Sequence, residues 1–175
     1  MRRRRVSCDR HENILLQGNF FWLRSRPGSF TQVPRAPKME LTTGPERIFK
    51  LCVADESARF QAAGTIRSEL DAADGFIHLS DRTSAPVVAG LFFSTAKDLR
   101  LIELASSKLA PLSWVVGKMG DAAPTPAEGE LAIHYLIPEG CVHVFGAGGV
   151  PTSAIVREES VPLGADGKHV FPDWL

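Results

Sequence analysis

From residue 46 onward, apolar and polar residues alternate in short runs that are typical of β-strands. In the run at 47–54 (RIFKLCVA), one face carries only aliphatic or aromatic residues, whereas Lys50 stands on the other face. Comparable runs predict further strands at 75–79, 98–105, 112–117, 131–137, 141–146 and 152–163. The pattern therefore indicates six or seven strands.

Two helices are predicted early in this segment. Asp55 can cap a helix that runs through 56–70, although Gly64 weakens its middle or ends it. Ser80 can cap the next helical turn, before the apolar run at 85–93. Because the later strands follow one another mostly without intervening helices, the order of elements favours an α+β fold over a doubly wound sheet.

Residues 1–45 have a different composition and are expected to form a disordered leader, with 46–175 as a single domain. Through residue 38 this leader holds eight arginines and one lysine against Asp9 and Glu12, and it shows no sustained period of 2 or 3.6 residues. It is interpreted as an organellar targeting peptide, as a tail that binds nucleic acid or a partner, or as an extension upstream of a start at Met39.

Composition limits the classes of function. Twenty basic and twenty acidic residues give no overall charge to attract nucleic acid or an anionic membrane. No apolar stretch reaches the roughly 18 to 20 residues that a membrane-spanning helix needs. The three cysteines are far apart and include no C-x-x-C pair, which favours reduced thiols. We expect a cytoplasmic protein, or a mitochondrial or plastid one if 1–38 is a transit peptide, without nucleic-acid or membrane partners.

Polar side chains interrupt three of the predicted strands. Lys50, His78 and His143 each stand opposite an apolar row, and Phe76 and Phe145 lie two positions from the histidines on the same face. Cations and hydrogen-bond donors hold phosphate, while aromatic rings stack on a base or on nicotinamide. These residues are therefore candidates for a shared cleft that binds a small nucleotide ligand.

Two further residues extend this hypothesis. Ser80 falls on the same strand face as His78, and His169 joins the cleft if the apolar C-terminal segment 162–175 docks beside the sheet. A simpler interpretation stays open, in which the polar residues face solvent on the outer side of a half-covered antiparallel sheet.

A metal site receives little support. Cys141 and His143, with His134 or His78, offer zinc-type donors, but their spacing matches no compact ligand pair. No metal is therefore expected.

Other motifs have structural interpretations. Ser80 stands in no G-x-S-x-G nucleophile elbow. The GAGG run at 146–149 lacks the rest of a phosphate-loop motif and is interpreted as a turn. Glu103 is interpreted as a solvated charge on a strand.

Seven stretches occur in a recognisable order along the chain: RIFKLC (47–52), ADGFIHLSDRTSAPVVAGLFF (73–93), KDLRLIEL (97–104), LSWVV (112–116), HVFG (143–146), VPTSAIV (150–156) and VPLGADGKHVFPDWL (161–175). Together they resemble the family catalogued as domain of unknown function 952. The most specific are DGFIHLS and PLGADGKHVFP, and the resemblance covers nearly all of 47–175.

The resemblance implies an α+β fold grouped with ADP-ribosyltransferases and tRNA 2'-phosphotransferases, in which a split antiparallel sheet encloses a nicotinamide-dinucleotide site. In those enzymes an early strand supplies a histidine or arginine that holds the dinucleotide, and a second strand supplies a polar or aromatic contact. By position along the strands, Lys50 looks like the first of these and His78 with Ser80 like the second.

The chain departs from the family pattern in three places. Val115 follows Trp114 where members have glutamate, Phe145 stands where they have tyrosine, and 117–140 replaces a shorter connection. If the family glutamate is catalytic, this protein is expected to bind without turnover, because an oxocarbenium-like ribose needs a nearby negative charge. Three glutamates could substitute for it: Glu128, Glu130 and Glu139.

The leading hypothesis is a domain that binds NAD or a related nucleotide and acts by transfer or hydrolysis at the nicotinamide–ribose bond. Lys50 would neutralise phosphate, the histidines would hydrogen-bond ribose or phosphate, and a phenylalanine would stack on a ring. A second hypothesis is a non-catalytic module that binds a protein partner through the loop at 117–140. An RNA 2'-phosphotransferase-like enzyme ranks below both, because the arginines of the domain are scattered.

Overall fold

The structure is a computed structural model that describes residues 44–109 and 112–175. Its helices are α1 (Ala54–Ala63), α2 (Glu69–Asp74) and α3 (Ser84–Phe92), with short 3₁₀ helices η2 (Ser106–Lys108) and η3 (Thr152–Ala154). Its strands are β1 (Arg47–Val53), β2 (Thr65–Ile66), β3 (Ile77–Ser80), β4 (Leu99–Ala105), β5 (Leu112–Gly117), β6 (Leu131–Leu136), β7 (Cys141–Phe145), β8 (Val150–Pro151) and β9 (Ile155–Ser160). Nearly all of the predicted leader lies outside the described residues.

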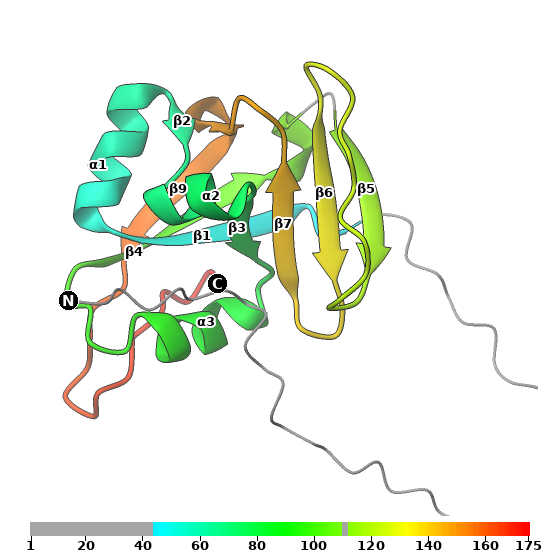
Figure 1. The fold of residues 1–175 in the computed structure, drawn as a ribbon. Coiled ribbons are helices and arrows are strands. Elements are labelled where there is room, and N and C mark those ends of the chain that lie inside the picture. Colours follow the sequence, from blue (N-terminus) through cyan, green and yellow to red (C-terminus); the bar gives the residue numbers. More distant parts are fainter. Residues whose placement is uncertain (1–43, 110–111) are drawn as a thin grey trace, which may run out of the picture. The chain divides into compact units, whose positions relative to one another are not determined.

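Seven strands form one sheet in the order β5-β6-β7-β3-β1-β4-β9, and β2 pairs with β8 separately. Neighbours in the large sheet are antiparallel except for β5 and β6, which are parallel. In Figure 1, β1 runs across the view, whereas β7, β6 and β5 run up and down. The two halves meet where β1 and β3 pair, and their register consists of Phe49 opposite Ser80 alone. We call this short pairing the split, although it still joins the two halves into one hydrogen-bonded sheet.

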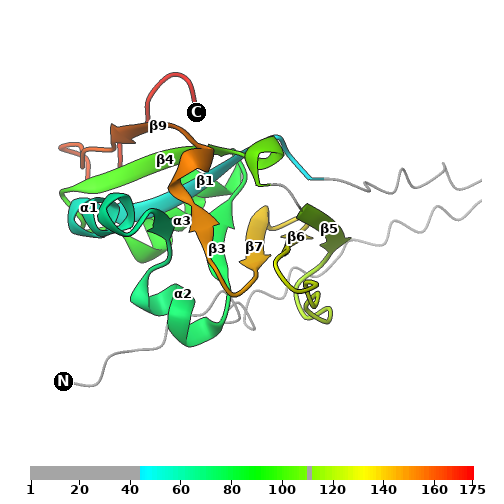
Figure 2. The same ribbon diagram turned by 90° about the horizontal axis from the view of Figure 1, so that it is seen from above.

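The strand order carries β7, β6 and β5 progressively away from β1, as the view from above shows (Figure 2). Apolar side chains from both halves nevertheless meet in one buried cluster, which includes Ile48 of β1, Ile102 of β4, Val142 of β7 and Ile133 of β6. Phe60 of α1 packs into the same cluster. Since burying each large apolar side chain contributes about 1.5 to 3 kcal/mol, this cluster helps to hold the two halves together.

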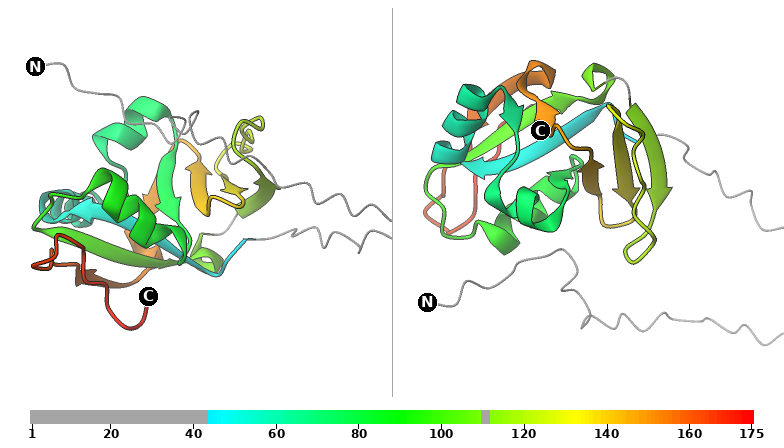
Figure 3. Two further views of the ribbon diagram at one scale, coloured as in Figure 1. Left: turned by 90° about the horizontal axis from the view of Figure 1, so that it is seen from below. Right: turned by 45° about the horizontal axis from the view of Figure 1, so that its top comes forward.

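A second apolar cluster lies on the opposite face of β1 and β4, because residues alternate between faces along a strand. Phe49 and Leu101 belong to it, together with Ala85 and Ala89 of α3. The C-terminal segment also packs there through Trp174, and Figure 3 shows this segment, in red, beside β4. The prediction that the C-terminal apolar residues dock on the domain is confirmed.

An ionic cluster fastens this segment. The buried carboxylate of Glu103 accepts hydrogen bonds from Arg47 at 2.6 and 3.1 Å and from Arg157 at 2.6 Å. Arg47 also donates to the carbonyl oxygen of Trp174 at 2.7 Å. The hydrogen bond from Arg47 is the largest cause that holds the pKa of Glu103 below its ordinary value, against the opposing effect of burial. The interpretation of Glu103 as a solvated charge is therefore wrong.

The α+β class is confirmed, but the expectation of two early helices is wrong, because the described part of the chain contains three. The helix predicted through 56–70 ends at Gly64, whose φ of 71° lies in the left-handed region that glycine adopts readily. The chain then forms β2 and a separate helix, α2. No helix within 44–109 or 112–175 is long and apolar enough to cross a membrane.

Candidate ligand-binding site

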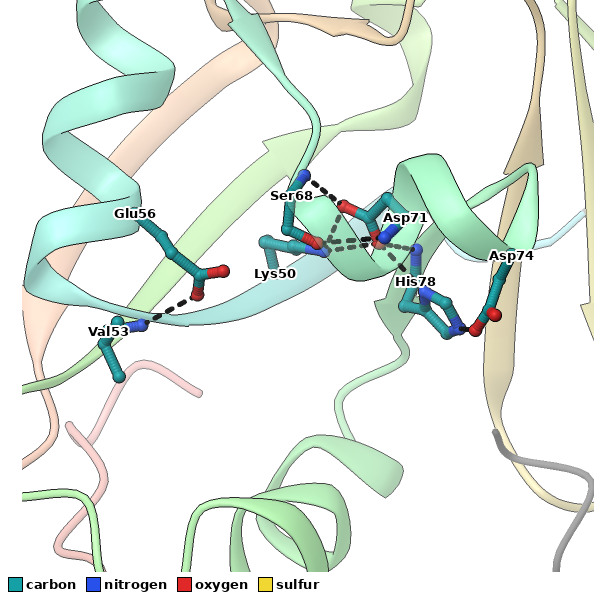
Figure 4. Close-up of polar contacts among 7 residues, drawn as sticks. All are labelled: Lys50, Val53, Glu56, Ser68, Asp71, Asp74 and His78. Atoms are coloured by element: carbon teal, nitrogen blue, oxygen red, sulfur yellow. Dashed lines mark hydrogen bonds and ion pairs between the residues drawn. The ribbon is translucent and has the colours of Figure 1, made fainter. Parts of the chain in front are cut away.

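The site is built around α2, a short helix that places Asp71 beside the split in the sheet (Figure 4). Ser68 precedes this helix, and its hydroxyl accepts a hydrogen bond from the backbone N–H of Asp71 at 3.1 Å. The carboxylate of Asp71 in turn accepts from the backbone N–H of Ser68 at 2.8 Å. This reciprocal capping box satisfies two helix N-terminal donors and fixes the direction of the Asp71 side chain.

Lys50 forms a buried ion pair with Asp71. Its Nζ lies 2.9 and 2.8 Å from the two carboxylate oxygens, and the side chains are 5% and 0% exposed. Burial alone would raise the pKa of Asp71, but the hydrogen bond from His78 and the charge of Lys50 outweigh it and hold the pKa below its usual range. Asp71 is therefore ionised at neutral pH, and the amino group of Lys50 is already engaged by this carboxylate.

Asp71 also holds His78. Its Oδ1 accepts a hydrogen bond from the backbone N–H of His78 at 3.0 Å and lies 2.8 Å from Nδ1 of the imidazole. Because an ionised carboxylate can only accept, Nδ1 is the donor in this contact. On the other side of the ring, Nε2 lies 3.4 Å from Oδ2 of Asp74. Within the described residues neither of these two atoms has a hydrogen-bond partner, so the imidazole of His78 is oriented by Asp71.

Aromatic rings gather beside this histidine. The Phe76 ring stacks on the imidazole of His143 at a centroid distance of 4.2 Å, and it lies 4.4 Å from that of His78 and 5.3 Å from the ring of Phe145. Phe76 and Phe145 are both partly exposed. The group therefore offers ring faces and edges next to an oriented imidazole.

Three histidines follow one another across adjacent strands, and we call them the histidine row: His78 on β3, His143 on β7 and His134 on β6. His78 lies opposite His143, and His143 lies opposite His134. His134 and His143 are only 3% and 7% exposed, and the Nε2 atom of each has no hydrogen-bond partner within the described residues. Burial, followed by the neighbouring His143, lowers the pKa of His134.

Five of the seven predicted ligand-binding residues come together here: Lys50, Phe76, His78, His143 and Phe145. Ser80 lies farther along β3, buried and opposite Phe49 and Cys141.

His169 does not join them. Its two ring nitrogens lie 3.2 Å from the carbonyl oxygen of Val161 and 2.9 Å from that of Phe93, so this histidine holds the C-terminal segment in place.

Two residues of the site were not among the predicted ligand-binding residues. Asp71 stands three positions after Ser68, and this Ser-x-x-Asp spacing is the sequence signal of a capping box. The sequence indicates His134 only as a metal donor, yet it lies opposite His143 on the same face of the sheet. Within the part of the chain that the structure describes, no group of three or more His, Cys, Asp or Glu side chains is arranged to hold a metal ion.

The long connection after β5 contributes to a different feature. A pocket of about 470 Å³ lies between this connection and the glycine-rich turn after β7, and its lining includes Gly129, Gly148 and Gly149. Two of the three glutamates considered as substitutes for the missing family acid, Glu128 and Glu130, line this pocket, whereas no histidine does.

Comparison with known proteins gives a family and a fold. A profile described as protein of unknown function (DUF952) matches residues 51–158. The crystal structure of protein CC0527 from Caulobacter crescentus is 23% identical, with a TM-score of 0.53 over 71% of this chain and 93% of that chain. A double mutant of the same protein is 24% identical, with a TM-score of 0.50 over the same shares. At this identity the likeness shows the fold alone. No curated protein matches the chain.

Proposed function

The chain belongs to the protein family of unknown function DUF952, and we propose that its domain binds NAD or a related nucleotide and acts at the nicotinamide–ribose bond in the manner of an ADP-ribosyltransferase. The observation that carries the proposal is the Asp71–His78 pair beside the ring of Phe76, with 2.8 Å between the carboxylate and Nδ1 and 4.4 Å between the rings. An imidazole oriented by a buried carboxylate is the arrangement that general acid–base catalysis and hydroxyl recognition require.

Each group has a role in this proposal. Phe76 and Phe145, which are partly exposed, stack against a planar ring of the ligand. His78 hydrogen-bonds a ribose hydroxyl, since Asp71 fixes its tautomer with the proton on Nδ1. Lys50 is a positioning residue, because its ammonium neutralises Asp71 inside the protein and is not free to bind phosphate.

The proposed reaction breaks the bond between ribose C1' and the nicotinamide nitrogen. Water or an acceptor hydroxyl forms the new bond to C1' and loses its proton, while nicotinamide leaves with the bonding electron pair. A carboxylate near the developing positive charge on the ribose lowers the barrier. Asp74 could serve as this carboxylate. Its Oδ2 lies 3.4 Å from Nε2 of His78, and Lys50 pairs with Asp71 and not with Asp74.

Isothermal titration of the full chain with NAD tests the proposal. Phe76→Leu removes the ring but keeps an apolar side chain, and His78→Ala removes the imidazole. Each is expected to weaken binding about tenfold or more, which corresponds to about 1.4 kcal/mol. Arg59→Ala, an exposed change in α1, serves as the matched control and is expected to bind like wild type. Thermal unfolding of each variant establishes that it is folded.

Two results would overturn the proposal. The first is an absence of heat when NAD is added to the wild-type chain in the millimolar range. The second is wild-type affinity in folded His78→Ala and Phe76→Leu. If NAD binds, incubation followed by chromatography for free nicotinamide tests the chemical step, and Asp74→Asn is expected to reduce the rate more than it reduces the affinity.

A further inference from the structure

Helix α3 is apolar on every side. Ser84 is the only residue of its nine with a polar side chain, and none is charged. A helix of this composition is normally buried all round, because a helix that borders water has a polar outer face. The inner side of α3 meets this expectation, since Ala85 and Ala89 are buried in the second apolar cluster.

The outer side of α3 is exposed instead. Val87 is 58% exposed, Leu91 is 51% exposed and Phe92 is 38% exposed. Seven large apolar side chains are exposed among the described residues, and three of them lie on this one helix. We call Val87, Gly90, Leu91 and Phe92 the α3 face. Exposed apolar side chains that gather on one element mark an interaction surface.

Gly90 lies among these side chains and has no role inside the domain. A Cβ atom built on Gly90 would meet no atom within 4 Å, and its φ is not positive. Neither space nor backbone conformation therefore requires glycine at this position, and glycine in a helix interior is destabilising relative to alanine. Glycine does allow another backbone to approach closely. The gap at Gly90 is therefore explained by a neighbour outside the domain.

The charges at the two ends of α3 indicate what kind of neighbour fits. Arg82 is exposed two residues before the helix and forms no hydrogen bond or ion pair with another described residue. A cation is unfavourable at a helix N-terminus and favourable at a C-terminus, and the last turn of α3 contains no basic residue. A second α3 packed antiparallel would place each arginine at the C-terminal end of the other helix. Since the chain has no net charge, two copies do not repel each other at long range.

We propose that the α3 face is the contact surface of a symmetric dimer, in which α3 of one copy packs antiparallel against α3 of the other. A two-fold axis between Val87 and Gly90 places the valine of each copy over the glycine of the other, and Leu91 and Phe92 enclose this contact. The surface consists of one helix of nine residues, so it is smaller than the interface of a stable dimer. The association is therefore weak, with a dissociation constant in the micromolar range.

The proposed dimer leaves the candidate ligand-binding site free. Phe49 and Lys50 are neighbours on β1 and point to opposite faces of the sheet. α3 packs with Phe49 in the second apolar cluster, whereas Lys50 contacts Asp71 of α2. In Figure 1, α3 and α2 accordingly lie on opposite sides of β1. The dimer does not depend on the proposed function, so either can fail without the other.

Sedimentation velocity of the full chain tests the dimer. Between about 5 and 500 µM, the weight-average mass of wild type is expected to rise toward twice that of one chain. Leu91→Glu places a charge on the α3 face of both copies and is expected to raise the dissociation constant about tenfold or more. Val156→Glu on β9 changes a 49% exposed valine and is the matched control, with wild-type association expected. Circular dichroism establishes that each variant is folded.

Two more variants test the packing itself. Gly90→Leu adds apolar surface but fills the gap on the α3 face, so it is expected to raise the dissociation constant about tenfold, whereas non-specific apolar association would become stronger. Arg82→Ala removes the charge from the C-terminal end of the other helix and is expected to weaken the dimer about threefold or more.

Four results would overturn the proposal. They are a monomeric wild type throughout the concentration range, wild-type association in folded Leu91→Glu, stronger association in Gly90→Leu, and loss of the dimer in Val156→Glu. If the wild-type monomer instead co-sediments with phosphatidylcholine vesicles and Leu91→Glu does not, the α3 face binds a lipid surface and not a second copy.

Discussion

Lys50 and Asp71 form a buried ion pair across the split in the sheet, with Nζ 2.8 Å from Oδ2 and 2.9 Å from Oδ1. Lys50 belongs to β1 in one half of the sheet, and Asp71 holds the backbone and imidazole of His78 in the other. The pair therefore couples the geometry of the proposed binding residue to the junction of the two halves.

Loss of the lysine is expected to destabilise the fold. Lys50→Met keeps most of the apolar stem but leaves Asp71 charged and buried without its cation, and breaking such a pair costs about 3 to 5 kcal/mol. Urea unfolding followed by circular dichroism measures the change. In the double variant Lys50→Met/Asp71→Asn the unpaired charge is gone, so part of the loss is recovered. A loss below about 1 kcal/mol in Lys50→Met would contradict this account.

Acid is expected to weaken the ionic cluster around Glu103. Hydrogen bonds from Arg47 and Arg157 hold the pKa of Glu103 in the folded protein below its ordinary value of 4.5. A group with a lowered folded-state pKa contributes stability above its unfolded-state value, and this contribution is lost as the pH falls through the folded-state value. The free energy of unfolding should therefore decline below about pH 4.5.

Glu103→Gln is the matched variant for this pH dependence. It keeps the side-chain shape but removes the charge, and it should cost about 1 to 2 kcal/mol at neutral pH, because both arginines are partly exposed and solvent screens them. Between pH 7 and pH 3 its unfolding free energy should change less than that of wild type. The difference between the two changes should be about 2 kcal/mol at most. Identical acid profiles of the two proteins would show that other groups govern acid sensitivity.

The C-terminal segment is expected to stabilise the domain through Trp174. Its indole donates to Glu159 at 2.6 Å, and the guanidinium of Arg157 lies 4.1 Å from its ring centroid. Since Trp174 is partly buried, Trp174→Ala should lower the free energy of unfolding by about 1 to 3 kcal/mol. This is less than the loss expected when a fully buried tryptophan is replaced by alanine. Val170→Ala, at a 58% exposed position in the same segment, should change stability by less than about 0.5 kcal/mol. Equal melting temperatures for the two variants would contradict the proposed anchoring.

The turn between α2 and β3 is expected to depend on Gly75. Its φ of 84° lies in the left-handed region, and a Cβ there would meet no atom within 4 Å, so Gly75→Ala is opposed by backbone strain alone. The expected loss is about 1 kcal/mol, whereas Gly90→Ala in α3 should stabilise by up to about 1 kcal/mol through helix propensity. Thermal unfolding compares them, and stabilisation by both changes would contradict the assigned turn.

Alternation along the chain was sufficient to predict the strands of the large sheet, because a strand with one buried face imposes a period of two. It was not sufficient for α2, whose six residues are too few to show a helical period, or for β2 and β8, which have two residues each. Alternation also carries no information on direction, so the parallel pairing of β5 with β6 was not predicted.

The aromatic and histidine residues of the site were predictable because each stands at an alternate position of a strand. Their polar partners were not. Asp71 lies 21 residues from Lys50 in sequence, and Arg47 lies 56 residues from Glu103. No local pattern distinguishes a charge that finds such a distant partner from one that faces solvent, so the sequence predicts neither the burial of Glu103 nor the engagement of Lys50 by Asp71.

The strand order has a consequence for how the polypeptide acquires its structure. Among the described residues, the first strand, β1, is central and pairs with β3 and β4, while the last, β9, pairs with β4 at the margin. The small sheet likewise joins Ile66 to Val150. Such pairings between remote residues raise the contact order and slow folding relative to helical domains of similar length. During synthesis, the large sheet cannot be completed until β9 has left the ribosome, so the apolar faces of the earlier strands stay partly uncovered until then.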